Sequence, residues 1–131
     1  MGRSELREHI FKMIFGLEFN PAEHLEEQLQ LYVDQLEDVS EKDTTYMIEK
    51  AKQIAEKAEE IDALINDNAT GWKTSRMNKV DLSILRLAIY EMKWDDDVPV
   101  KVAINEAVEL GKRFSSDDGP AFINGVLGKL A

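Results

Sequence analysis

The sequence lacks cysteine altogether, which excludes disulfide bonds and thiol chemistry. Histidine is scarce as well: neither His9 nor His24 has a second histidine or cysteine at ligand spacing, so we expect no transition-metal site. No apolar run approaches the roughly 18 residues that a membrane-spanning helix needs, and charged residues interrupt the N-terminal segment where a secretion signal would be apolar. These absences predict a soluble, cytoplasmic protein.

Motifs of catalysis are missing too. The sequence has no glycine-rich phosphate loop, since its C-terminal glycines lie in an apolar helical pattern, and no motif supports a Ser/His/Asp arrangement. Three adjacent carboxylates, Asp95 to Asp97, precede Pro99, where negative charge complements the dipole of a starting helix. We therefore interpret them as a helix start rather than a metal site. The residues favour a binding protein without a cofactor over an enzyme.

The charge of the chain is strongly uneven. Its 131 residues, 44% apolar and 32% charged, are typical of one folded domain, and the formal net charge is −10. Residues 21–67 hold 14 acidic and 4 basic side chains, whereas the rest of the chain is neutral. Residues 72–93 hold five basic side chains against two acidic ones. We expect the acidic region to be solvated helix surface, which leaves other faces able to meet phosphate.

Apolar residues recur at helical spacing along nearly the whole chain, and no convincing strand is found. The pattern predicts six main helices and a short turn around Trp72. Their approximate ranges are 4–19, 21–36, 41–66, 78–93, 99–114 and 120–130. Arg86 interrupts the most apolar of these helices. Because a buried arginine without a partner is very costly, Arg86 is predicted to form an ion pair or to reach the surface.

Several helix starts carry recognisable capping residues. Ser4 is predicted to cap the first helix, and Asn20-Pro21 reads as a cap followed by proline at the first helical position. The segment Ser40 to Asp43 resembles a capping box in which Asp43 takes the reciprocal place. These signals set the expected starts of the first three helices.

The first helix carries two apolar stripes, although a surface helix needs only one. Phe11, Phe15 and Phe19 are spaced by four residues and form the second stripe. This stripe is either buried within the domain or a docking face for another protein, since interface centres favour aromatic residues. Arg3 and Arg7 flank the stripes and could reach phosphates.

The segment FSSDDGPAFING (114–125) breaks one helix and starts another. Asp118 or Gly119 is expected to cap the last helix, and Pro120 sets its first turn. Phe122 lies in that turn. Its ring either packs against Val126 in the core or stacks on an unpaired RNA base. The carboxylate of Asp118 would repel phosphates, so a strong non-specific RNA site is not expected.

Three segments are specific in their residues, order and spacing: DLSILRLAIYEM (81–92), VPVKVAINEAVELGKRF (98–114) and FINGVLGKL (122–130). They resemble the C-terminal half of the NusB family, which are bacterial transcription antitermination factors. The resemblance implies an all-helical domain over residues 1–131, with about seven helices in two subdomains. It also implies a function without catalysis: NusB proteins pair with NusE, a small-subunit ribosomal protein, and bind boxA single-stranded RNA. The pair then joins the RNA polymerase antitermination complex.

Carried over position by position, the resemblance implies two groups of site residues. The RNA-binding positions are Arg3, Arg7, Lys101, Asp118, Phe122 and Asn124. The NusE-binding positions are Phe15, Phe19 and Asp81. The chain departs from the family pattern at Ala121, where many members are basic, and at Gly119-Pro120. We therefore expect weak RNA binding by the protein alone and tighter binding with NusE, which can add cationic surface.

Two alternatives stay open. The chain could be the NusB-like domain found fused to RNA cytosine methyltransferases, which would require a longer parent protein. It could also be a homodimeric helical scaffold without an RNA role, in which the phenylalanine stripe packs against itself.

Overall fold

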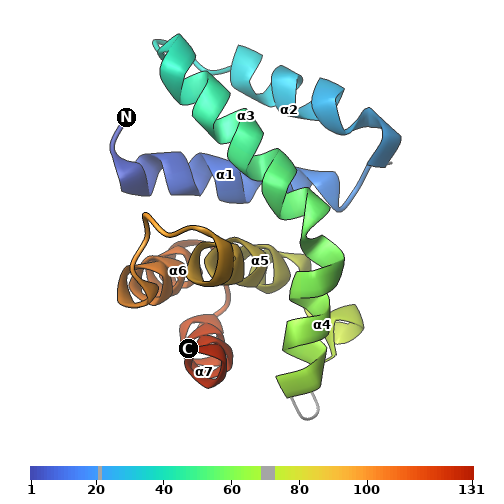
Figure 1. The fold of residues 1–131 in the computed structure, drawn as a ribbon, viewed down its shortest axis with the longest axis vertical. Coiled ribbons are helices and arrows are strands. Elements are labelled where there is room, and N and C mark those ends of the chain that lie inside the picture. Colours follow the sequence, from blue (N-terminus) through green and yellow to red (C-terminus); the bar gives the residue numbers. More distant parts are fainter. Residues whose placement is uncertain (21, 69–72) are drawn as a thin grey trace. The chain divides into compact units, whose positions relative to one another are not determined.

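Helices form nearly all of the regular structure in the computed structural model, which describes all residues except 21 and 69–72 (Figure 1). The described residues form seven α-helices, two short 3₁₀ turns and no strand, so the predicted all-α fold is confirmed. The helices are α1 (Arg3–Leu17), α2 (Leu25–Asp34), α3 (Glu41–Glu56), α4 (Ala58–Asn68), α5 (Lys79–Trp94), α6 (Val100–Phe114) and α7 (Gly119–Leu130). The turns are η1 (Ala22–His24) and η2 (Thr74–Arg76). No described helix has the length and hydropathy to cross a membrane.

The chain divides into two compact units, Met1–Glu56 and Lys57–Ala131, as the expected pair of helical subdomains. In the first unit, α3 packs on both α1 and α2. The core consists of apolar side chains at helical spacing, among them Ile10, Leu29 and Met47, which are fully buried. A salt bridge of 2.6 Å between Lys52 Nζ and Glu26 Oε1 also links α3 to α2. The apolar stripes read from the sequence therefore pack three helices together.

Two predicted helix starts in this unit are wrong. The first helix begins at Arg3 with Gly2 in the N-cap position, so Ser4 lies inside the helix rather than capping it. Asn20 does not begin the second helix: its Nδ2 donates to the carbonyl of Gly16 at the end of α1, and α2 starts only at Leu25. An asparagine side chain can hydrogen-bond to the backbone at the C-terminus of a helix as well as at its N-terminus. The presence of asparagine alone therefore did not show which helix end it caps. The proline of this motif lies outside the described residues.

The capping residues before α3 behave as predicted in one of their two bonds. Ser40 Oγ accepts a hydrogen bond from the backbone N–H of Asp43 at 3.1 Å. The Asp43 carboxylate instead accepts from the N-terminal ammonium of Met1, also at 3.1 Å. The acidic residue of this capping motif therefore also ties down the start of the chain.

The single long helix predicted over 41–66 is wrong, because the structure has a break at Lys57 that separates α3 from α4. The apolar residues along this predicted helix pack into two different cores. On one side of the break, Met47 and Ile54 are buried in α3, which packs on α1 and α2. On the other side, Ile61 and Ile65 are buried in α4, which packs on α5 and α7. No glycine or proline marks the break, so helical periodicity alone could not reveal it.

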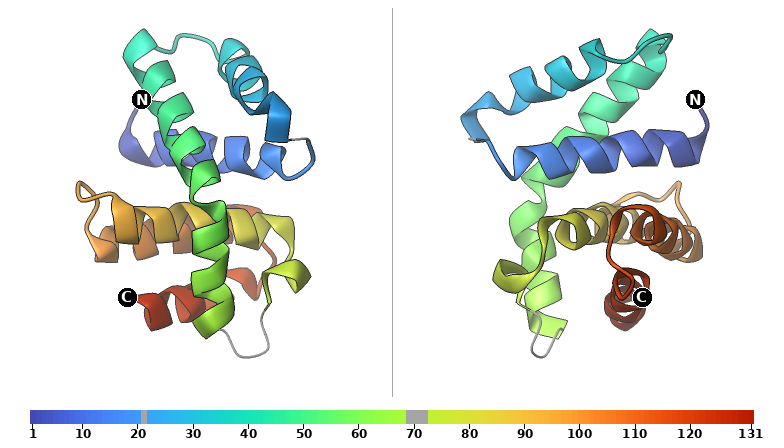
Figure 2. Two further views of the ribbon diagram at one scale, coloured as in Figure 1. Left: turned by 45° about the vertical axis from the view of Figure 1, so that its right-hand side comes forward. Right: turned by 180° about the vertical axis from the view of Figure 1, so that it is seen from behind.

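The second unit is built around α5, which is buried on most of its sides as its composition predicts. Helices α6 and α7 pack against α5 and against each other, and α4 contacts α5 and α7 (Figures 1 and 2). The cap of α5 is well formed, since Asn78 Oδ1 accepts from the N–H of Asp81 at 2.8 Å. Arg86 of α5 pairs with Asp62 of α4 at 2.7 Å, which confirms the predicted ion pair. The predicted turn around Trp72 lies outside the described residues.

Candidate functional site

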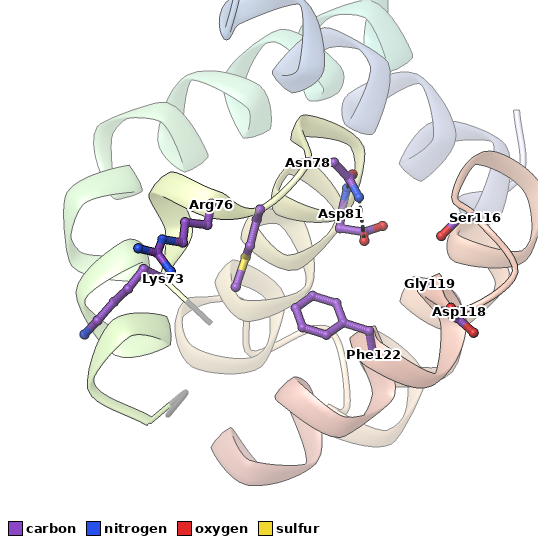
Figure 3. A pocket seen from close by; sticks show the side chains of 9 residues that line it. Lys73, Arg76, Asn78, Asp81, Ser116, Asp118, Gly119 and Phe122 are labelled. Carbon is purple, nitrogen blue, oxygen red and sulfur yellow. Dashed lines mark hydrogen bonds between the residues drawn. The ribbon is translucent and has the colours of Figure 1, made fainter. Parts of the chain in front are cut away.

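A pocket opens in the second unit beside the starts of α5 and α7 and the η2 turn (Figure 3). Its volume is about 310 Å³. It is lined by Lys73, Arg76, Met77, Asn78, Asp81, Ser116, Asp118, Gly119 and Phe122. Three of the residues predicted from the sequence, Asp81, Asp118 and Phe122, meet in this pocket although 37 or more positions separate the first from the others.

The sequence left two environments open for Phe122, the core and an RNA-binding surface, and the structure shows an environment intermediate between them. Its side chain is half-buried and lines the pocket, and Figure 3 shows its ring between the cationic and acidic groups of the wall. The neighbouring Ile123 and Val126 are buried and attach α7 to the core. The ring is therefore held by its own helix while part of its surface faces the pocket.

Asp81 is anchored inside the second unit and is only 6% exposed. Its Oδ1 accepts from Ser115 Oγ at 2.5 Å, and its Oδ2 accepts from Asn78 Nδ2 at 3.0 Å. Ser115 is the residue after α6, so these bonds connect the end of α6 to the start of α5. The structure thus gives Asp81 a positioning role at the pocket, and its contact with NusE stays a prediction.

The remaining RNA-binding positions are spread over the chain. Arg3 is exposed in the first turn of α1, but Arg7 is only 6% exposed, which leaves little of its guanidinium for a phosphate. Lys101 is exposed on α6. Asn124 is exposed on α7 and lines a separate groove beside Asn105. Lys101 and Asn124 belong to the same unit as the pocket but do not line it, Arg3 and Arg7 belong to the first unit, and the RNA contacts of all four stay predictions.

The phenylalanine stripe changes from buried to exposed along α1 and the turn that follows it, because α1 ends at Leu17 and Phe19 lies two residues beyond it. Phe11 is 3% exposed, Phe15 is half-buried and Phe19 is 62% exposed. The rings of Phe15 and Phe19 meet edge to face with their centroids 5.0 Å apart. The two alternatives for this stripe therefore apply to different residues: Phe11 belongs to the interior, whereas Phe19 presents apolar surface that a partner could cover.

Six residues of the pocket wall were not predicted as site residues, and three of them are Lys73, Arg76 and Met77. They belong to η2 and its flanks, between α4 and the cap of α5. The positive balance of residues 72–93 was a signal for the two cations, but the helical pattern offered no reason to place this short turn beside Phe122. Within the described residues, no group of three or more His, Cys, Asp or Glu side chains could hold a metal ion.

Fold and site together define a helical binding protein: a pocket with an aromatic wall and charged ends, and an exposed phenylalanine on a second surface. The chain belongs to the NusB family, whose sequence profile matches residues 4–131. It is 51% identical to transcription antitermination protein NusB of Agathobacter rectalis over the full length of both chains. It is 47% identical to the protein of the same name from Lachnoclostridium phytofermentans, covering 99% of this chain and 98% of that one.

Solved structures agree with this assignment. The structure of T. maritima NusB has a TM-score of 0.86 and 31% identity, covering 100% of this chain and 91% of the other. A chain from the crystal structure of a plectonemic RNA supercoil shares the fold, with a TM-score of 0.83 at 22% identity. The resemblance seen in three C-terminal segments thus extends over the whole chain and confirms the family.

Proposed function

We propose that this protein acts in transcription antitermination as a non-catalytic, cytoplasmic RNA-binding adaptor. Relatives that match it over nearly their full length are transcription antitermination proteins. As the family resemblance implies, its partners would be NusE, boxA single-stranded RNA and the RNA polymerase antitermination complex. The observation that carries the proposal is the pocket beside α7, in which the ring of Phe122 is accessible next to two exposed cations, Lys73 and Arg76.

An accessible aromatic ring suits an unpaired base, because every base has a flat face that can stack on it. The protein as a whole is poorly suited to bind RNA by charge alone. The formal net charge is −10, and the exposed carboxylate of Asp118 stands at the same pocket. Repulsion of phosphates by these groups weakens the electrostatic part of RNA binding. A partner that adds cationic surface would restore it, which supports binding as a complex with NusE.

Replacing Phe122 by alanine should weaken boxA binding by about 2 kcal/mol, or roughly 30-fold, because one base loses its stacking partner. Fluorescence anisotropy with labelled RNA, with and without NusE, measures this effect. Phe114→Ala is a matched control, since Phe114 is also half-buried in this unit but does not line the pocket. Wild-type affinities that are equal with and without NusE would contradict the role of the partner. No RNA binding in either case would contradict the proposed function.

Replacing Phe19 by aspartate should weaken NusE binding by about 2 kcal/mol, because a charge would replace an aromatic side chain that NusE buries in the complex. Stability should change little, since Phe19 is 62% exposed. Leu31→Asp is the control, because Leu31 is 61% exposed on α2 of the same unit. Calorimetric titration with NusE gives the affinities. Equal losses for both variants would point to a general charge effect, and a Phe19-dependent homodimer in sedimentation would favour the scaffold alternative.

A further inference from the structure

We infer that the pocket binds one nucleotide of the RNA in a fixed orientation, with its phosphate against Lys73 and Arg76 and its base between Met77 and Phe122. This inference rests on the proposed RNA-binding function. It adds the η2 wall of the pocket to the RNA site and assigns the phosphate and the base of the nucleotide to different parts of the pocket.

The two cations stand on a turn that is firmly anchored. Thr74 of η2 donates its backbone N–H to Asn66 Oδ1 at 2.9 Å, and Asn66 Nδ2 donates to Thr74 Oγ1 at 3.2 Å. Asn66 belongs to α4, so both bonds attach the turn to a packed helix. Within the turn, the N–H of Arg76 donates to the carbonyl of Lys73 at 2.9 Å. Because the backbone of the turn is already ordered, the ordering cost of binding a phosphate there is confined to two side chains.

Charges of opposite sign lie at opposite ends of the pocket. Figure 3 shows Lys73 and Arg76 on one side of the Phe122 ring and Asp118 on the other. Asp81, which also lines the pocket, adds a second carboxylate away from the cations. The polarity of a nucleotide is complementary to that of the pocket, because its phosphate is anionic while its base carries hydrogen-bond donors. Coulomb attraction therefore favours the phosphate at the Lys73 and Arg76 end, and the carboxylates disfavour it at the other end.

The middle of the pocket suits a base. Met77 follows Arg76 directly and is half-buried in the wall. Thioether and aromatic groups both make favourable contacts with flat π systems. The volume of about 310 Å³ lies at the lower end of the range of roughly 300–1,000 Å³ for small-ligand pockets. This space suits one nucleotide rather than a run of bases.

The test replaces both cations in the variant Lys73→Gln/Arg76→Gln and measures boxA affinity with NusE present at several salt concentrations. The slope of log K against log salt should become shallower by about 0.7, because the two cations contact one phosphate and each neutralised phosphate of a single strand contributes roughly 0.7. The variant Lys42→Gln/Lys129→Gln is the matched control. It removes the same charge from two exposed lysines that do not line the pocket, so its slope should stay at the wild-type value. Lys73 and Arg76 are exposed, and unfolding measurements should show unchanged stability for both variants.

A second measurement tests the orientation. Single phosphates of the RNA are replaced one at a time by uncharged methylphosphonates, and wild-type protein should lose affinity at one linkage in particular. In Lys73→Gln/Arg76→Gln the same replacement should cost almost nothing, since contacting groups are not additive. Additive losses at every linkage would overturn the inference. So would a wild-type salt slope in the pocket variant while Phe122→Ala still weakens binding, and the proposed function would then stand. Absence of RNA binding by the wild-type complex with NusE would contradict both the proposed function and this inference.

Discussion

Replacing Gly119 by alanine is expected to destabilise the protein by about 4 kcal/mol, from overpacking and from the loss of a hydrogen bond to a charged group. Gly119 is the first residue of α7 and is buried against Ser115. A β-carbon there would lie 1.9 Å from Ser115 Oγ and 2.5 Å from Ser115 Cβ. Both distances are far below van der Waals contact, so Ser115 or the start of α7 must move.

The movement has a second cost because Ser115 is engaged. Its hydroxyl donates to the buried carboxylate of Asp81, and pushing it away would leave that carboxylate with one hydrogen-bond donor fewer. A bond of this kind contributes about 1.5–3 kcal/mol, and overpacking adds typically about 1–3 kcal/mol. Since Ser116, Asp118 and Phe122 follow or flank this corner, the pocket should lose its shape as well.

Two other glycines of the same helix supply the control. Gly125 and Gly128 have no heavy atom within 4 Å of an added β-carbon. Gly125→Ala and Gly128→Ala should therefore stabilise the protein by about 0.5–1 kcal/mol each, because alanine loses less backbone entropy in a helix. Urea unfolding followed by circular dichroism compares the three variants. A loss below about 1 kcal/mol for Gly119→Ala would show that the corner can relax and that the packing argument is wrong.

Replacing Asp62 by asparagine is expected to destabilise the protein by about 3 kcal/mol, because it removes the carboxylate charge that faces the largely buried Arg86 guanidinium. Two hydrogen bonds form the pair: Arg86 Nε donates to Asp62 Oδ1 at 2.9 Å, and a second guanidinium nitrogen donates to Oδ2 at 2.7 Å. The side chains are 13% exposed for Arg86 and 24% for Asp62. This residual access to water places the cost at the lower end of the range for buried pairs.

The pair also shows why a buried ion pair is not stabilising in itself. Burial raises the pKa of Asp62 to about 6 and lowers the pKa of Arg86. The hydrogen bonds from the guanidinium act in the opposite direction on Asp62, since they stabilise the ionised carboxylate. The double variant Asp62→Leu/Arg86→Met should therefore be about as stable as the wild type, whereas each single change is costly. Urea unfolding of the two single variants and the double variant measures the coupling. A double variant no more stable than the single ones would contradict this account.

Much of the second unit could be predicted from local signals. The predicted range 78–93 matches α5 closely because Asn78 is a strong cap and the apolar residues after it are dense. Arg86 could be assigned an ion pair before any partner was known, since the cost of an unpaired buried charge does not depend on where the partner lies. The segments that carried the family resemblance belong to this unit, and the family they indicated is confirmed over residues 4–131.

Signals near the first two helices and at Lys57 were less reliable. Ser4 and Asn20 have the right side chains for capping, but neighbouring residues took that position or the side chain bonded elsewhere. The break at Lys57 arises because the stripes of α3 and α4 pack into different cores, and one continuous apolar pattern is compatible with either arrangement.

The sequence by itself determined the all-helical fold class, the absence of cysteine chemistry, the need of Arg86 for a partner and the family, because these follow from spacing, composition and residue-specific costs. Only the tertiary structure decided which side chains share a site. It brought Lys73 and Arg76 to the same pocket as Phe122, turned Asp81 inward onto Ser115, and left Phe19 exposed while burying Phe11. The physical reason is that a pocket is made by packing segments distant in the chain, and a helical period gives the faces of each helix but not the neighbours that they meet.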